Sequence, residues 1–239
     1  MIITVSFPNP RTDKTVNSTH FSGVEIHGNV FISVANQDVF NFHHMNQSHY
    51  FNLLLEKLPQ SSSDFTSRLK ERCEILSLEK NEPLISFQSR NRKIYFIAEG
   101  SFIRYIITSG GDEKTVMFHT ESFCEFFKSY DTVYFHKNTD YEVRANEKSV
   151  VISVDFDFLF HEIQQDLELL RFYTRETEKL FVNIDLFRNF QLSLTSEEYL
   201  KWLYENYPFL FQRFASQNIA SFMGITNVWL SNLRSRLTF

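Results

Sequence analysis

Residues 215–237, near the C-terminus, read ASQNIASFMGITNVWLSNLRSRL, and this stretch decides the fold of the last part of the chain. Ile219, Ala220 and Met223 are spaced to share one face of a helix, for which Ser216 is the expected N-cap. Gly224 follows where that helix must stop, because glycine tolerates left-handed backbone angles. The stretch therefore predicts a short helix that ends in a sharp turn.

A second helix is expected directly after this turn. Ile225 is predicted to fill the corner and Thr226 to cap the next helix, whose inner face carries Leu230, Leu233 and Leu237. Ala220 must be small because the second helix crosses close to it. This is the helix-turn-helix arrangement, in which the second helix lies in the major groove of DNA. A plain helical hairpin shares some of these features and is the alternative interpretation.

The helix-turn-helix interpretation predicts which side chains meet DNA. Asn227 and Asn232 suit adenine, and Val228 suits a thymine methyl group. Guanine-reading arginines are missing apart from Arg234, so the preferred operator is expected to be rich in A·T pairs. The predicted DNA-binding residues are Gln217, Thr226, Asn227, Val228, Ser231, Asn232, Arg234 and Ser235.

The chain carries little positive charge for a DNA-binding protein. The whole chain carries a net charge of −5, which excludes a global attraction to nucleic acid. From residue 191 onward, four basic residues (one Lys, three Arg) stand against three Glu, a net charge of +1. Arg213, Arg234 and Arg236 are expected to face DNA, and binding is expected to depend on the avidity of a dimer.

The middle of the chain, from about residue 73 to 154, reads as short strands separated by turn residues. KIYFIAE, SFIRYII, VMFHT, TVYF, YEVRAN and KSVVISV are the expected strands, and Gly110–Gly111 are expected to supply the positive φ angles of a hairpin. Many short strands with such turns indicate an antiparallel sandwich or roll. Residues 73–78 fit either a strand or the end of the preceding helix.

From Asp155 to Phe190 the spacing of apolar residues changes to the period of a helix. An apolar stripe with alternating spacings of four and three runs along it, through Ile163, Leu167, Leu170, Thr174, Thr177, Phe181 and Ile184. This stripe must cover the roll, a second subunit, or both, and dimerisation is the preferred interpretation. Thr195 and Glu198 then predict a capping box and a further helix that ends before Pro208.

The remaining features bound the class of protein. Residues 1–44 show no lasting periodicity. They are expected to be a poorly ordered extension, a segment that precedes the biological start at Met45, or a small hairpin. Two distant cysteines, no apolar run long enough for a membrane and no signal-peptide pattern predict a cytoplasmic protein. The histidines are expected to hold no metal, and the absence of a nucleophile elbow, a phosphate-binding loop and an HExxH motif argues against an enzyme.

The segment from Leu194 to Leu237 resembles the Crp/Fnr family of bacterial transcription regulators. The resemblance rests on Tyr207–Pro208, Ile219–Ala220, Gly224–Thr226 and Leu230–Arg234, and upstream on IYFIAEGSFIRYI and YEVRANEKSVVISV, which are similar to strands of the family's cyclic-nucleotide-binding roll. The resemblance implies a homodimer that binds a palindromic operator in double-stranded DNA, with RNA polymerase as a further partner.

The family's cyclic-nucleotide site is degenerate in this sequence. Family members hold the ribose and phosphate with a Gly-Glu pair and an Arg-Ser/Thr pair, which align here with Cys124–Glu125 and Thr139–Asp140. A phosphate needs a cationic donor, and only Lys137 with a shifted loop would supply one. The roll is therefore not expected to bind cyclic AMP in the family's manner, and its effector is unknown, with no cofactor expected.

These observations predict an α+β protein with four parts: an extension at 1–44, a β-roll sensor at 45–160, a long connecting and dimerisation helix at 161–192, and an all-α, winged-helix-like helix-turn-helix domain at 193–239. The predicted function is a sequence-specific, DNA-binding transcription regulator. The alternative is a sensor or protein-interaction module that has lost DNA binding.

Overall fold

A computed structural model describes residues 48–60 and 62–236, all of which lie within one unit of the chain, His43–Phe239. The predictions for residues 1–44 and for Leu237 lie outside the described residues. Residues 48–57 are helical, and helix α2 (Ser63–Arg72) follows, with its N-cap Ser62 accepting a hydrogen bond from the Phe65 amide. None of the described helices is long and apolar enough to span a membrane.

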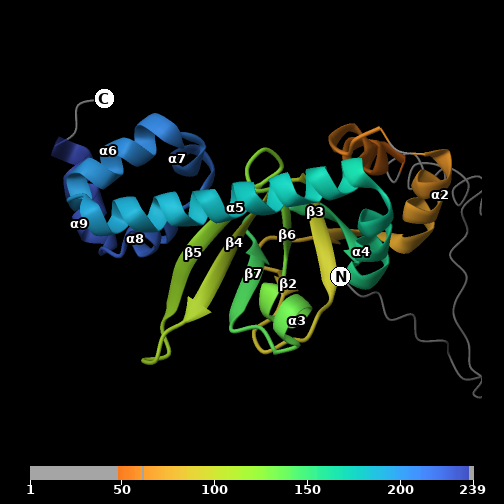
Figure 1. The fold of residues 1–239 in the computed structure, drawn as a ribbon. Helices are drawn as coiled ribbons and strands as arrows, with labels where there is room; N and C mark the ends of the chain where they lie inside the picture. The colour runs from red at the N-terminus through yellow and green to blue at the C-terminus, as the bar shows by residue number, and fades with distance from the viewer. Residues whose placement is uncertain (1–47, 61, 237–239) are drawn as a thin grey trace, which may run out of the picture. The chain divides into compact units, whose positions relative to one another are not determined.

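The central part of the chain is a roll of two four-stranded antiparallel sheets (Figure 1). The first sheet has the order β1-β8-β3-β6 and the second the order β2-β7-β4-β5. Their bounds are β1 (Cys73–Leu78), β2 (Pro83–Ile85), β3 (Lys93–Glu99), β4 (Ser101–Ile107), β5 (Glu113–Thr120), β6 (Phe126–Lys128), β7 (Tyr141–Ala145) and β8 (Ser149–Asp155). The prediction of an antiparallel roll is confirmed, and residues 73–78 are a strand.

The core of the roll lies between the two sheets. It is built from alternate residues of strands in both sheets, including the fully buried Ile97, Phe102 and Val151. Gly100 joins β3 to β4 with a φ of +99°, and a Cβ there would lie 2.2 Å from Ser149 Oγ. Of the two glycines predicted for the β4–β5 turn, Gly111 has a positive φ and Gly110 does not.

One predicted strand is wrong. TVYF lies in helix α3 (Tyr130–Phe135). Although Thr, Val, Tyr and Phe favour strands, the Arg92 guanidinium donates to the carbonyl oxygens of Thr132 and Val133 at 3.2 and 3.0 Å. Arg92 thereby satisfies carbonyl groups at the end of this short helix.

The helical segment after the roll is two helices instead of one. Helix α4 (Phe156–Gln165) ends at Asp166, which has extended backbone angles and caps helix α5 (Leu167–Ser193). The predicted apolar stripe is therefore shared between α4 and α5. Ile163 is buried on α4, Thr177 and Ile184 are half-buried, and Leu167, Leu170, Thr174 and Phe181 are exposed on α5.

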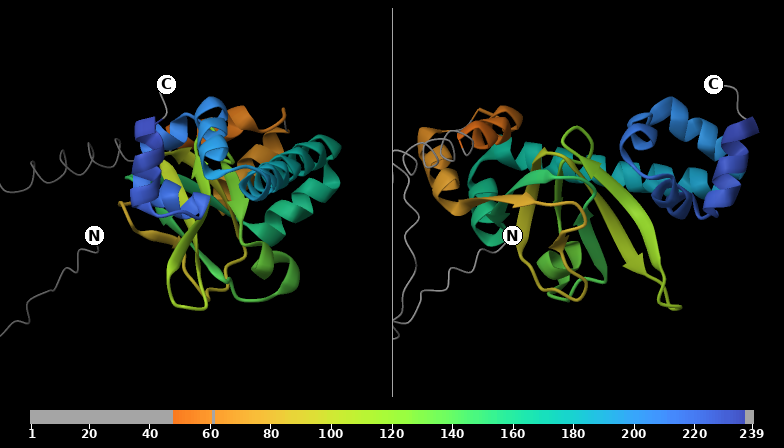
Figure 2. Two further views of the ribbon diagram at one scale, coloured as in Figure 1. Left: turned by 90° about the vertical axis from the view of Figure 1, so that its left-hand side faces the viewer. Right: turned by 180° about the vertical axis from the view of Figure 1, so that it is seen from behind.

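Four short helices follow α5 and gather at its C-terminal end (Figures 1 and 2). They are α6 (Ser196–Asn206), α7 (Phe209–Arg213), α8 (Ser216–Met223) and α9 (Asn227–Arg236). The predicted capping box of Thr195 and Glu198 is present, and α6 ends before Pro208 as predicted. The described part of this segment contains helices only. Its buried face includes Leu200, Leu203 and Leu210, which belong to one cluster with Ile103 and Phe118 of the roll.

Candidate nucleic-acid interface

Helices α8 and α9 are joined by the turn that the sequence predicts. Gly224 has a φ of +74° and ends α8, with its amide donating to carbonyl oxygens at the end of that helix. The Thr226 hydroxyl accepts a hydrogen bond from the Trp229 amide at 3.1 Å and so caps α9. Ala220, at 2% exposure, lies on the buried face of α8, and Leu230 and Leu233 are buried on α9. These contacts fix the angle between the two helices.

The predicted cap of α8 is wrong. Ala215 is the N-cap and makes no side-chain hydrogen bond there, whereas Ser216 is the first helical residue. The Ser216 hydroxyl instead accepts from Arg234 Nη1 at 2.7 Å. This bond links the start of α8 to the end of α9, so Ser216 stabilises the pair of helices and not the single helix end.

The exposed face of α9 carries most of the predicted DNA-binding side chains. Its members are polar apart from Val228, which is 72% exposed. The exposed residues are Gln217 on α8, Thr226 in the turn, and Asn227, Val228, Ser231, Asn232 and Ser235 on α9. On α9 the exposed residues lie on the side away from the buried Leu230 and Leu233, and Gln217 and Thr226 line one groove with Asn227.

Two arginines that are predicted to contact DNA make internal contacts. Arg234 is half-buried: it bonds to Ser216, its guanidinium lies 5.4 Å from the ring centre of Phe211, and its Nε is buried. Arg213 pairs with Glu121 at 2.7 Å and with Glu147 at 2.5 Å, both in the roll. Contacts of Arg213 and Arg234 with DNA stay predictions, and each would require these internal contacts to break. Arg236 is exposed beside the ring of Trp229.

Sequence reasoning did not single out Trp229. The residue is 38% exposed, and it lines a groove together with Asn227 of α9 and with the β4–β5 hairpin. An exposed tryptophan next to predicted base-reading residues was the available signal, since solvent-exposed aromatic rings mark recognition surfaces.

The roll packs against the helix-turn-helix through α8. The Thr115 amide on β5 donates to Ser221 Oγ at 3.0 Å. The Phe118 ring lies 4.5 Å from that of Phe214 and 5.1 Å from that of Phe222. Asp112, Glu113 and Lys114 of the β4–β5 hairpin line the same groove as Asn227, and Glu113 pairs with Arg144, so charges of both signs lie beside the first turn of α9.

The residues of the predicted degenerate effector cassette (Cys124, Glu125, Lys137, Thr139 and Asp140) have surroundings that do not suit an anion. Cys124 is buried and has a φ of +49°, so it keeps a backbone conformation that suits the glycine expected there. Burial raises the pKa of the Cys124 thiol to about 12. The Glu125 carboxylate is 3.5 Å from Lys57 Nζ and 3.4 Å from Lys179 Nζ, so two cations already neutralise it.

The second half of the cassette is also unsuited to an anion. Thr139 is buried and donates its hydroxyl to the Ser86 carbonyl at 3.0 Å. Asp140 is exposed, and the pKa of the neighbouring Asp131 is raised by its burial and then by the charge of Asp140. Lys137 is exposed and does not replace the missing arginine through any contact that the structure describes.

Solved structures show what this fold resembles. FixK2 from Bradyrhizobium japonicum is 16% identical, with a TM-score of 0.57 over 69% of this chain and 84% of that one. A double mutant of CooA from Carboxydothermus hydrogenoformans is 14% identical, with a TM-score of 0.58 over 73% and 80%. The c-di-GMP-responsive global regulator CLP from Xanthomonas campestris is 10% identical, with a TM-score of 0.58 over 73% and 91%.

Comparison of the sequence with family models and with curated proteins finds no related protein. The structural neighbours are Crp/Fnr regulators with cyclic-nucleotide-binding folds, and the chain has their fold, as the sequence resemblance predicted.

Proposed function

We propose that this chain, which has the fold of the Crp/Fnr regulators, is a homodimeric, sequence-specific DNA-binding transcription regulator and not an enzyme. Its roll does not bind cyclic AMP in the family's manner. It acts in the cytoplasm on a palindromic operator, with RNA polymerase as a further partner.

One observation carries the proposal. Helix α9 buries Leu230 and Leu233 completely while it exposes Asn227, Ser231 and Asn232 on its other face. A helix held this firmly from behind presents short polar side chains at a fixed angle, which is what reading base edges in a major groove requires. A helix that only completed a core would have no need of this uncharged hydrogen-bonding face.

The proposal of a dimer rests on α5. Leu167, Leu170, Phe181 and Leu192 are 60%, 39%, 53% and 75% exposed, and their spacing places them along one side of the helix. A second copy of the same stripe would cover them. Two-fold symmetry would then place two α9 helices about one turn of DNA apart.

A second candidate is a sensor or interaction module without DNA binding. The internal pairing of Arg213 and Arg234 leaves Lys201 and Arg236 as the exposed cations of the described helices after α5. Affinity for DNA rises with the number of phosphates that the protein neutralises, so few cations predict weak binding.

A binding measurement separates the two candidates. Ser231→Glu with Asn232→Glu adds two charges to the exposed face of α9, and fluorescence anisotropy with a labelled random-sequence duplex at low salt measures the effect. We expect affinity to fall about tenfold or more, because the added carboxylates repel phosphates. The matched control is Gln164→Glu with Gln165→Glu, which adds the same charge on exposed positions of α4.

The control should bind as the wild type does. Equal affinity of the α9 variant and the wild type, or no binding by the wild type at low salt, would favour the interaction module.

A further inference from the structure

Lys128, on strand β6, is a buried cation without a buried anion. It is 5% exposed, and its Nζ donates to the Tyr173 hydroxyl at 2.7 Å. The same Nζ lies 4.7 Å from the ring centre of Tyr130, 5.5 Å from that of Tyr134, 5.9 Å from that of Phe156 and 4.4 Å from that of Tyr173. Among the described residues, no carboxylate forms an ion pair with it.

Aromatic faces and one hydroxyl compensate only part of the cost of burying an ammonium group. Burial lowers the pKa of Lys128 to about 8, so the group is still mostly protonated at neutral pH. A buried charge is normally paired with an opposite charge or neutralised. Lys128 therefore lacks an anionic partner, and a bound anionic ligand would supply one.

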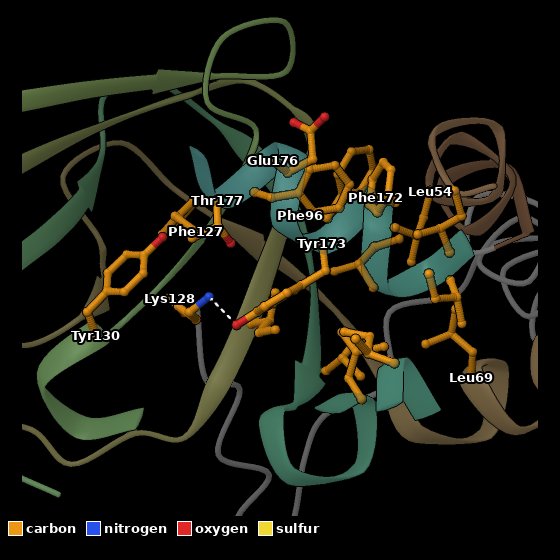
Figure 3. A pocket seen from close by; sticks show the side chains of 18 residues that line it. Leu54, Leu69, Phe96, Phe127, Lys128, Tyr130, Phe172, Tyr173, Glu176 and Thr177 are labelled. Atoms are coloured by element: carbon orange, nitrogen blue, oxygen red, sulfur yellow. Dashed lines mark hydrogen bonds between the residues drawn. The ribbon is translucent and has the colours of Figure 1, made fainter. Parts of the chain in front are cut away.

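Lys128 lies at one end of an apolar cavity of about 70 Å³. The cavity lies between helix α5 and the outer face of the β1-β8-β3-β6 sheet. Figure 3 shows Lys128 and Tyr130 at one end, Phe96 and Phe172 in the middle, and Leu54 and Leu69 at the other end. The cavity thus has a cationic end with hydroxyl groups and an apolar remainder.

One further charged residue lines the cavity. The Glu176 carboxylate points away from Lys128 in Figure 3 and is 3.3 Å from Lys179 Nζ and 3.5 Å from Arg175 Nε. It is already neutralised outside the cavity. The hydroxyls of Tyr130 and Thr177 line the same end as Lys128 and are placed to donate to an anion.

We propose that this cavity binds a short apolar monocarboxylate, with its carboxylate on Lys128 and its hydrocarbon chain directed toward Leu54 and Leu69. A single cation matches a single negative charge, whereas a dianionic phosphate would leave one charge unpaired in an apolar site. The small volume selects a short chain. None of the cassette residues Cys124, Glu125, Lys137, Thr139 and Asp140 lines this cavity, so the site is separate from the family's cyclic-nucleotide position.

The site itself does not depend on DNA binding. The further inference, that its ligand is the effector of the regulator, rests on the proposed function. Helix α5 contributes Tyr173 and Thr177 to the cavity and Leu170 and Phe181 to the exposed stripe. A bound carboxylate would contact the helix that we expect to join two subunits.

Isothermal titration of the full chain with propionate, and with propan-1-ol as the neutral analogue of the same length, tests the proposal. We expect propionate to bind at least about tenfold more tightly than propan-1-ol, because only the acid pairs with Lys128. Lys128→Met should abolish this preference and leave propan-1-ol binding unchanged. The matched control Lys148→Met removes an exposed lysine that does not line the cavity and should behave as the wild type.

A second measurement uses the wild type alone, so it stands even where a variant fails to fold. Propionate affinity should fall with rising pH above about pH 8, by up to about tenfold per pH unit, while propan-1-ol affinity stays constant. The titratable groups that face Lys128 are Tyr130, Tyr134 and Tyr173. Burial raises the pKa of Tyr130 and of Tyr173, so the phenols of Tyr130 and Tyr173 stay neutral over this range.

Three results would overturn the proposal: no binding of acetate, propionate or butyrate by the wild type; equal affinity for propionate and propan-1-ol; or unchanged propionate binding in folded Lys128→Met. A wild type that binds propionate but no DNA would contradict the proposed function and keep this site. A wild type that binds DNA but no short monocarboxylate would contradict this site and keep the proposed function.

Discussion

His119 is a titratable side chain held neutral inside the roll. It is 2% exposed, its Nδ1 donates to the Cys124 carbonyl at 2.9 Å, and its ring lies 4.7 Å from that of Phe127. Burial lowers the pKa of His119 to about 4. Between about pH 6.5 and pH 4 the unfolded chain binds a proton that the folded chain does not, so stability is lost as the pH falls through this window.

We predict that lowering the pH from 7 to 5 destabilises the wild type by about 2 kcal/mol more than His119→Asn, whose amide can keep the hydrogen bond to Cys124. Urea unfolding followed by circular dichroism measures both free energies of unfolding. The exposed His161→Asn serves as the control and should follow the wild type. Parallel pH dependences of the wild type and His119→Asn would refute the assignment.

At the residue scale, the sequence predicts what depends on neighbours in the chain. Gly224 and Thr226 occupy their expected positions because a positive φ and an N-cap are local requirements. Arg213 and Arg234 are different. The acids that bind Arg213 are 92 and 66 residues away in sequence, and the partner of Arg234 is 18 residues away on the facing helix. Such pairings become visible only once the fold brings the segments together.

At the scale of elements, the break between α4 and α5 is set by Asp166. Its carboxylate Oδ1 accepts from the amides of Glu168 at 2.8 Å and Leu169 at 3.1 Å. An aspartate followed by an acidic first turn is an N-cap signal, and the apolar stripe obscured it. Helix α3 offered no such signal, because the Arg92 side chain that binds its carbonyl groups comes from a distant part of the chain.

Replacing Asp166 by alanine should destabilise the protein by about 1 kcal/mol, the usual cost of losing an N-cap side chain. Asp166→Asn should restore most of this loss, since its amide oxygen can accept the same bonds. Thermal or chemical unfolding provides the measurement, with the exposed mid-helix change Glu178→Ala as the control. An Asp166→Ala variant as stable as that control would show that the cap is dispensable.

At the scale of the whole molecule, the exposed stripe on α5 predicts a dimer. Leu170→Glu with Phe181→Glu should convert it to a monomer, because two charges would be buried against their own copies. Light scattering after size exclusion reports the mass. Phe87→Glu with Phe135→Glu changes two residues outside α5 that are 41% and 66% exposed and should leave the dimer intact. A monomeric wild type, or a dimeric α5 variant, would contradict this arrangement.

The α+β class, the roll and the order of the helices follow from turn residues and periodicity, so the sequence predicts them. The surface of α9 follows in the same way, because exposure of Asn227 and Asn232 is the consequence of burying Leu230 and Leu233 on a regular helix. The contact between α8 and β5, the charged hairpin beside α9 and the cavity at Lys128 join residues far apart in the chain, and local patterns do not reveal them.

The central claim is that α9 reads DNA sequence, and affinity selection by the purified full chain from a random duplex library, at two salt concentrations, tests it most directly. The account predicts an enriched inverted repeat, rich in A·T pairs, with half-sites about one helical turn apart. It also predicts that Asn227→Ala with Asn232→Ala loses this enrichment while it keeps the fold. No enrichment at low salt, or the same repeat selected by the double variant, would contradict it.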